Sequence, residues 1–363
     1  MSRHPEKTGN DHPGIHQQGE RTMSNPVTSH RGFLAPLLGV VFSALALQGC
    51  SLIYKTTGDI LIHYGQDEMV ADMMADDDVA MGCALGESMT PLLMSFERVG
   101  SKPDKLGVLV YVTASTCAEE KALEEELRYS RALQAGNVSE ARDARTNQKR
   151  YHALAAKRQQ ESYRRLSQVY RKMEDDTCPR LRSDFDELVW MVGLIGGVQA
   201  VLNDGAADGS VGVPRNVPAQ VVRGTRCLDN DKWWGVPEGV RAALWSILPA
   251  LGPEDVDAWT MLERAEQTGF DEGVRLGSAL YAQAAYTQAN DERLREAIRG
   301  FVNYDGAVHP DYRMLDAIAH HMVRSLSDRL WTEETGQRTP FGKLGEFWDD
   351  EDEEDDLDIE GLL

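Results

Sequence analysis

The chain has 363 residues, with 38 Lys or Arg against 59 Asp or Glu, and a formal net charge of −21 at pH 7. Nucleic-acid phosphates and anionic lipid heads repel a protein this acidic, so the composition excludes a nucleic-acid-binding protein. The length is sufficient for one large helical domain or two smaller ones with sizeable cores.

Residues 1–49 predict an N-terminal extension followed by an export signal. An apolar run over residues 33–47 comes directly after His30 and Arg31 and ends in small residues. This order is typical of a secretory signal peptide. The run holds about 15 apolar residues, whereas a helix that spans a bilayer needs about 20. Met23 would begin a signal of ordinary length, so the residues before it are set aside from the fold.

The signal ends in Leu47-Gln48-Gly49-Cys50, which resembles the lipobox of bacterial lipoproteins. The resemblance implies cleavage before Cys50, with diacylglycerol on its sulfur and an acyl chain on its new amino group. Two or more acyl chains hold a protein stably on a membrane, whereas one binds only marginally. Because Ser51 and not Asp follows Cys50, the resemblance implies the periplasmic face of a Gram-negative outer membrane. The alternative is a plain signal peptide with an incidental cysteine.

Four further cysteines predict two disulfides, because the periplasm is oxidising. Sequence alone allows three pairings, and we favour Cys83–Cys117 and Cys178–Cys227, since each would tie neighbouring helices together. The spacings fit neither a zinc ribbon nor a CxxC redox site.

The mature chain reads as mostly helical, because apolar residues recur every three or four positions. The first half predicts helices over residues 52–74, 79–99 with Pro91 as a kink or internal start, 105–135, 138–173 and 188–202. Asp76, Asp77 and Asp78 are expected to cap the second of these. Gly136 and Asn137 separate two long helices, which predicts an αα-hairpin. The helix over 188–202 is apolar almost all round and is expected to be buried.

The second half begins with a predicted loop over residues 203–217, rich in Gly and Pro. Helices are then expected over residues 218–227, 237–248, 253–268, 273–290, 291–302 and 310–331. We expect a helical domain over residues 50–340. Residues 341–363 are expected to be a disordered acidic tail, because like charges repel and little is apolar.

No motif of a known catalytic class occurs, so we predict no catalytic residues, no cofactor and no metal. His320 and His321 are candidates for a metal site with His309, but adjacent side chains on a helix point about 100° apart. Asn203 and Asp204 are interpreted as turn residues, because the Glu that closes a calcium loop is missing.

Two candidate binding surfaces remain. The helix over residues 141–172 is strongly basic, and its face around Arg158 and Arg165 is a candidate for docking an acidic partner. The alternative is pairing within the chain, with the glutamates of the preceding helix: Glu119, Glu120, Glu124, Glu125 and Glu126. A second candidate is an apolar ligand groove lined by aromatic side chains, with ordinary core packing as its alternative: Trp190, Trp234, Trp245 and Tyr281.

Two stretches, residues 106–170 and 279–298, resemble tetratricopeptide-type helix pairs. In the second, Ala282 and Ala285 allow close helix approach and Asp291 starts the second helix. With the lipobox, this arrangement resembles the T-component lipoproteins of TRAP transporters. The resemblance implies an all-α fold of stacked antiparallel helix hairpins, either a TPR-like α-solenoid or an irregular helical array. It also implies cooperation with a periplasmic solute-binding protein, and it carries over no site residues.

The expected function is therefore a membrane-anchored, non-enzymatic adaptor that binds a protein or a small apolar ligand. The alternative is a structural envelope lipoprotein that supports outer-membrane integrity through the acidic tail and the basic helix. A hydrolase with catalytic groups scattered along the sequence is the third hypothesis.

Overall fold

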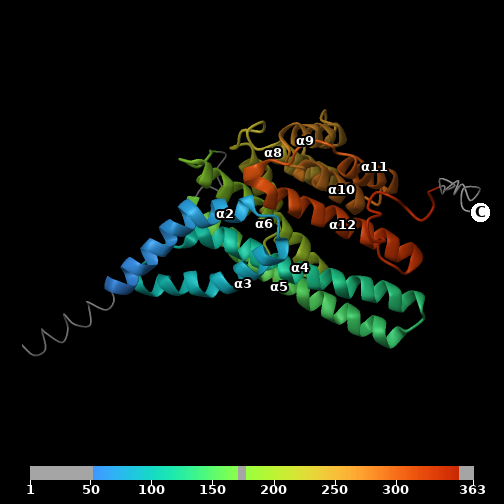
Figure 1. The fold of residues 1–363 in the computed structure, drawn as a ribbon, viewed down its shortest axis with the longest axis horizontal. Coiled ribbons are helices and arrows are strands. Elements are labelled where there is room, and N and C mark those ends of the chain that lie inside the picture. The colour runs from blue at the N-terminus through green and yellow to red at the C-terminus, as the bar shows by residue number, and fades with distance from the viewer. Residues whose placement is uncertain (1–51, 171–176, 351–363) are drawn as a thin grey trace, which may run out of the picture. The chain divides into compact units, whose positions relative to one another are not determined.

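The computed structural model describes residues 52–170 and 177–350, so the predicted signal and Cys50 lie outside the described residues. The chain divides into two units, Met1–Cys50 and Ser51–Leu363, and all the described residues belong to the second. Throughout the described ranges the regular structure is helical, which confirms the predicted all-α class (Figure 1).

The first described helix runs over residues 52–64 and continues through a π-helical turn, Gly65–Met69, into α2 (Val70–Ala75). The next helix, α3 (Val79–Ser95), runs on through Pro91 and ends in the 3₁₀ turn Phe96–Val99. The carboxylate of Asp78 accepts the backbone N–H of Met81 at 2.8 Å, so the predicted acidic cap is confirmed.

The predicted αα-hairpin is α4 (Asp104–Gln134) and α5 (Val138–Tyr170), which turn at Gly136 with a positive φ of 67° (Figure 1). The predicted buried helix is α6 (Asp184–Ala206), which packs on both. At Gly193 a Cβ atom would lie 2.8 Å from Leu166 Cδ1. This glycine therefore allows α6 to approach α5 closely.

The loop expected over residues 203–217 begins later than predicted, because Asn203 and Asp204 belong to the last turn of α6. The Asn203 side chain is held by Glu119, with its Nδ2 2.7 Å from Oε1. The carboxylate of Asp204 accepts the backbone N–H groups of Val211 and Val213, each at 2.8 Å. Asp204 therefore organises the turn, as interpreted, but from inside the helix. The chain then enters α7 (Val217–Thr225).

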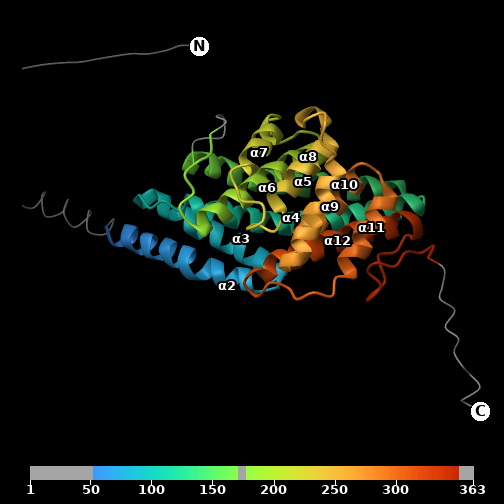
Figure 2. The same ribbon diagram turned by 90° about the horizontal axis from the view of Figure 1, so that it is seen from above.

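The C-terminal helices are α8 (Val236–Ile247), α9 (Ala258–Glu272), α10 (Leu276–Thr287), α11 (Asp291–Val302) and α12 (Arg313–Thr335). The bounds of α11 match the prediction, whereas α9 starts five residues later than the predicted residue 253. Its start is set by Asp257, whose side chain caps Trp259 N. α12 packs against α10 and also reaches α4 and α2 (Figure 2).

The packed structure extends at least ten residues beyond the domain boundary expected at residue 340. Phe347 is only 4% exposed, and Trp348 packs edge-to-face on Trp331 of α12. Asp349 and Asp350 form ion pairs with α11 at 2.6 and 2.5 Å, through Arg295 and Arg299 respectively. The predicted tail is therefore wrong over residues 341–350, because two aromatic rings and two ion pairs fix this segment. Residues 351–363 lie outside the described part.

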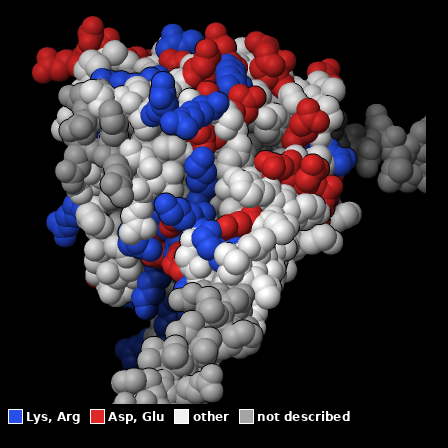
Figure 3. All heavy atoms as spheres, turned by 90° about the vertical axis from the view of Figure 1, so that its left-hand side faces the viewer, with Lys and Arg blue, Asp and Glu red and all other residues white. Residues whose placement is uncertain are grey.

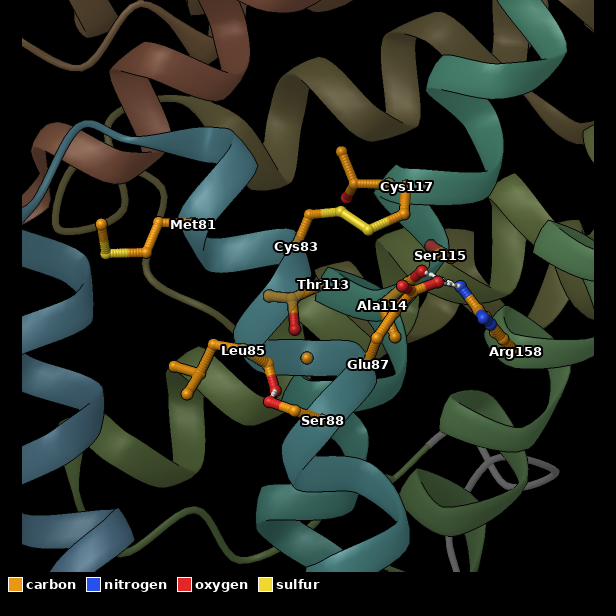
Figure 4. The surroundings of a disulfide bond; sticks show 12 residues. Met81, Cys83, Leu85, Glu87, Ser88, Thr113, Ala114, Ser115, Cys117 and Arg158 are labelled. Atoms are coloured by element: carbon orange, nitrogen blue, oxygen red, sulfur yellow. Dashed lines mark hydrogen bonds and ion pairs between the residues drawn. A yellow bond between two sulfur atoms is a disulfide. The ribbon is translucent and has the colours of Figure 1, made fainter.

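Both favoured disulfides are present. Cys83 of α3 bonds to Cys117 of α4, with their Cα atoms 5.6 Å apart (Figure 4). Cys178, ahead of α6, bonds to Cys227, just after α7, with Cα atoms 5.4 Å apart. Each bond ties neighbouring helical segments, as the sequence indicated.

Two helical segments of the described chain are long and apolar enough to cross a membrane: Val79–Val99 and Asp184–Ala206. The second forms α6 and is mostly buried within the protein, so its composition is that of a core helix. The first is 28% buried over its most apolar window, because one side of α3 faces outward.

One carboxyl group between α9 and α10 predicts a pH-dependent stability. Burial raises the pKa of Glu266 from 4.5 to about 7, and the nearby Ser278 hydroxyl opposes this rise only in part. The Oε1 atom of Glu266 has no hydrogen-bond partner among the described residues. The unfolded chain releases this proton near pH 4.5 and the folded chain near pH 7, so stability falls as pH rises between these values. Each pK unit corresponds to about 1.4 kcal/mol.

We therefore expect Glu266→Gln to be more stable than the wild type by about 1–3 kcal/mol above pH 7 and similar to it near pH 4.5. Urea unfolding of both proteins across this range measures the difference. Glu263→Gln is the control, because Glu263 is exposed and paired with Arg293. A difference between Glu266→Gln and wild type that does not change with pH would contradict this expectation.

Candidate binding groove beside α12

The predicted aromatic groove is wrong, because its four side chains lie in the core and are between 1% and 8% exposed: Trp190, Trp234, Trp245 and Tyr281. Trp190 packs edge-to-face on Tyr170, and its Nε1 donates to the carbonyl of Gly224 at 2.9 Å. The rings fill helix junctions, and none of them lines either cavity described below.

The predicted partner-binding basic face is also wrong at Arg165. Its side chain is 5% exposed and forms ion pairs with Glu97, Asp104 and Glu161. Arg158 donates to Glu87 at 2.7 Å and to the carbonyl of Ala114 (Figure 4). Both guanidinium groups therefore join α5 to α3 and α4 and are not available as a docking face.

Pairing within the chain is thus the correct alternative, but its partners differ from those expected. Of the glutamates on α4, Glu119 accepts from Gln159 of α5 at 2.8 Å, and burial raises the pKa of Glu119. Glu126 pairs with Arg329 and Glu124 with Arg338, both beyond α5 in the chain. The acids of α4 therefore also hold the C-terminal helices.

Two adjoining cavities lie along α12, with volumes of about 680 and 530 Å³. The first is bounded by α4, the end of α11 and residues 338–344, and the second by the start of α3 and the segment before α12. Five residues line both: Glu120, Arg275, His320, His321 and Arg324. We call this continuous hollow the α12 groove.

A buried ion pair fixes one wall of the α12 groove. Arg275, just ahead of α10, donates from Nε to Asp316 Oδ1 at 2.8 Å and from Nη2 to Oδ2 at 2.6 Å. The same guanidinium donates to the carbonyl of Phe301 and lies 4.0 Å from the centre of its ring. A charge held by so many contacts positions α10, α11 and α12 relative to one another and is not free for a ligand.

Two charged residues line both cavities without an ion pair in the described part of the chain: Arg324 on α12 and Glu120 on α4. Both are exposed, and no carboxylate of the described residues bonds Arg324, whose Nη2 atom lies 3.1 Å from His321 Nδ1. Burial, together with the charge of Arg324, lowers the pKa of His320 and His321 below 6.5, so both are neutral at pH 7. Where the two cavities meet, the groove thus presents the cation of Arg324 and the carboxylate of Glu120 at neutral pH.

Apolar surface lies beside these charges. Phe341, on the segment after α12, is fully exposed, and Leu123 and Val302 also line the first cavity. A groove with an unpaired cation, an unpaired carboxylate and an exposed aromatic ring suits a protein segment that carries both charged and apolar side chains. Among the described residues no cluster of His, Cys, Asp or Glu is arranged to hold a metal ion.

Sequence reasoning singled out His320 and His321 but not the groove around them. Their neighbours Glu120 and Arg275 lie far away in the chain, and neither stands in a recognisable motif. The local signal was this pair of adjacent histidines on α12. In comparisons with known proteins, no family model, no curated protein and no solved structure matches this chain.

Proposed function

We propose that this chain is a periplasmic helical lipoprotein, anchored to the outer membrane through lipid on Cys50, that acts as a non-enzymatic binding adaptor. The observation that carries the binding role is the α12 groove, where Arg324 and Glu120 are exposed beside Phe341 and form no ion pair within residues 52–170 and 177–350. Exposed charges beside an apolar ring are the surface that a protein partner can complement.

The anchoring part rests on the lipobox-like sequence at Leu47–Cys50. The two disulfides support an oxidising compartment, because such bonds persist outside the cytoplasm. An anchor that confines the adaptor to a membrane surface raises its effective concentration near a partner, so that binding need not be tight.

A periplasmic solute-binding protein of a TRAP-type transporter is the partner that the family resemblance suggests. This part of the proposal is supported by the two repeat-like stretches, which form the helix hairpins α4–α5 and α10–α11. The aromatic side chains predicted to line a groove for a small apolar ligand are buried in the core, so a protein partner in the α12 groove is the better candidate.

We expect Arg324→Glu to lower recovery of the partner by on the order of tenfold. The substitution replaces a cation of the interface with a carboxylate, which repels the acidic group of the partner that Arg324 would bind. The measurement is quantitative mass spectrometry after cross-linking in cells and purification of the full-length chain. Arg142→Glu is the matched control, because Arg142 is an exposed cation of α5 outside the groove. Equal recovery from both variants, or no discrete partner with either, would refute the adaptor role.

The anchor is tested separately. Radioactive palmitate should label the wild type and not Cys50→Ala, because the proposed acyl chains depend on the Cys50 sulfur. An unlabelled wild type would refute anchoring while leaving the α12 groove to be judged by the pull-down.

A further inference from the structure

The first described helix exposes large apolar side chains at its start. Leu52, Ile53 and Tyr54 are 66%, 65% and 59% exposed, and Ile60 is 62% exposed further along the helix. Exposed apolar side chains concentrated at one helix end mark a place where the protein meets a partner or a membrane.

The end of α3 lies beside this helix start. A Cβ atom on Gly58 would be 2.7 Å from Phe96 Cδ1, and the Ser101 hydroxyl donates to the carbonyl of Lys55 at 3.2 Å. Leu92, 47% exposed, lies one turn before Phe96 and thus near the same end of α3. The two helices therefore present apolar side chains together.

The outward side of α3 continues this surface without a charge. Figure 4 shows Met81 and Leu85 directed away from Cys83 and Cys117, which tie the opposite side of α3 to α4. Its exposed residues at helical spacing are all uncharged: Ala80, Met81, Ala84, Ser88, Leu92 and Ser95. Because a helix facing water normally carries charged residues on its outer side, this side of α3 is suited to an apolar environment.

Positive charge borders the apolar surface although the whole chain is strongly acidic. Arg98 and Lys102, between α3 and α4, are both exposed, and neither has an acidic partner among the residues described. Figure 3 shows Lys and Arg gathered down the middle of this face, with Asp and Glu mainly along its upper and right-hand parts. Local cations beside apolar side chains match the phosphates and acyl chains of a phospholipid surface.

The length of chain that separates Leu52 from the proposed lipid identifies the occupant. Only Ser51 stands between Cys50 and Leu52, and two residues span at most about 7 Å. Acyl chains on Cys50 would therefore hold Leu52, Ile53 and Tyr54 at the bilayer surface, where the Tyr ring and Lys or Arg side chains are favoured.

We propose that residues 52–60, Leu92, Arg98 and Lys102 form a membrane-contact face that lies on the phospholipid bilayer and orients the anchored protein. This inference rests on the proposed lipid at Cys50. It goes further, because a lipid anchor alone would leave the helical body free to tumble. With this face on the bilayer, the turn between α4 and α5 extends away from it. Arg165 pairs with Glu97, next to Arg98 of this face, whereas Arg142 lies near the turn. The two residues are 23 positions apart along α5, which corresponds to about 35 Å.

The test is photo-cross-linking of the full-length chain in living cells. p-Benzoylphenylalanine replaces Tyr54, Leu92 or, as the distal control, Val138, which is exposed at the start of α5. We expect phospholipid adducts, identified by their mass, at Tyr54 and Leu92 and none at Val138. In the charge-reversed variant Arg98→Glu/Lys102→Glu, each of the two substitutions should lower the adduct yield at Leu92 by about fivefold. The control substitution Arg142→Glu should leave that yield unchanged.

The outcomes separate this inference from the proposed function. A cross-link at Tyr54 and Leu92 to a second copy of this chain, or to another protein, would overturn the membrane-contact face. If palmitate labels the chain but no lipid adducts form, the membrane-contact face is refuted and the lipid anchor is not. Lipid adducts in a chain that palmitate does not label would support the face and refute the anchor.

Discussion

Asp316→Ala is expected to lower the free energy of unfolding by about 3–5 kcal/mol, because it leaves the Arg275 guanidinium charged, mostly buried and without its carboxylate. The side chain of Asp316 is 6% exposed and that of Arg275 is 14% exposed, so water cannot replace the lost partner well. The measurement is urea unfolding of wild type and variant at pH 7.

The size of this effect follows from the number of contacts that depend on the pair. Asp316 accepts the backbone N–H of Arg275 at 3.1 Å as well as two guanidinium bonds. Arg275 in turn bonds the last turn of α11 through the carbonyl of Phe301. Loss of one carboxylate therefore loosens the junction of α10, α11 and α12 and one wall of the α12 groove.

The control is an ion pair on the surface. Arg299→Ala removes the pair with Asp350, whose two side chains are 44% and 37% exposed, and should cost about 0–1 kcal/mol. Arg275→Met combined with Asp316→Leu should be less destabilised than the sum of the single variants, because neither charge is left buried alone. Equal losses for Asp316→Ala and Arg299→Ala would contradict the assigned role of Asp316.

The helices were predictable because their signals are local. The α4–α5 hairpin is encoded by apolar periodicity and by Gly136 at the turn, and the start of α11 by Asp291 and the Asn290 cap. The errors at α6 and α9 occurred where a longer-range contact or a single capping side chain, Asp257, set the boundary. Helix bounds therefore follow the sequence closely except where tertiary contacts extend or delay a terminal turn.

The α12 groove was not predictable in the same way, because distant segments make it. Glu120, Arg275 and Arg324 come from separate stretches, and nothing local marks them as neighbours. The predicted docking face on the basic helix was wrong for a related reason. Arg158 pairs with Glu87 and Arg165 with Glu97, and these acids are 71 and 68 residues away in the chain. A cluster of like charge on one helix indicates a docking face only when the opposing helices carry no matching acids.

The second large effect is expected from the disulfide that holds the segment ahead of α6. Cys178→Ser/Cys227→Ser should lower the free energy of unfolding by about 2–4 kcal/mol, because the bond closes a 49-residue separation and so restricts the unfolded chain. Cys83→Ser/Cys117→Ser should cost a similar amount, since its separation of 34 residues is not much smaller. Urea unfolding of both double variants measures these losses.

The two disulfides should nevertheless differ in their response to a reductant. Cys178 is exposed, whereas Cys83 and Cys117 are 6% and 8% exposed, so an attacking thiolate reaches the Cys178–Cys227 bond first. Mass spectrometry of alkylated protein after mild reduction should therefore find Cys178 and Cys227 modified while Cys83 and Cys117 remain bonded. Simultaneous modification of all four would contradict this order.

Opening the exposed bond should release one segment and leave the helices packed. Residues 177–183 are not helical, and besides the disulfide they are held by the packing of Leu181 against the core and by the backbone N–H of Arg182, which donates to Asp186 at 3.1 Å. Trypsin should then cleave after Arg180 and Arg182 in the mildly reduced protein much faster than in the oxidised one. By contrast, α3 should stay on α4 even without Cys83–Cys117, because Gly86 lets the two helix backbones pack in direct contact: a Cβ there would lie 2.5 Å from Ala114 N.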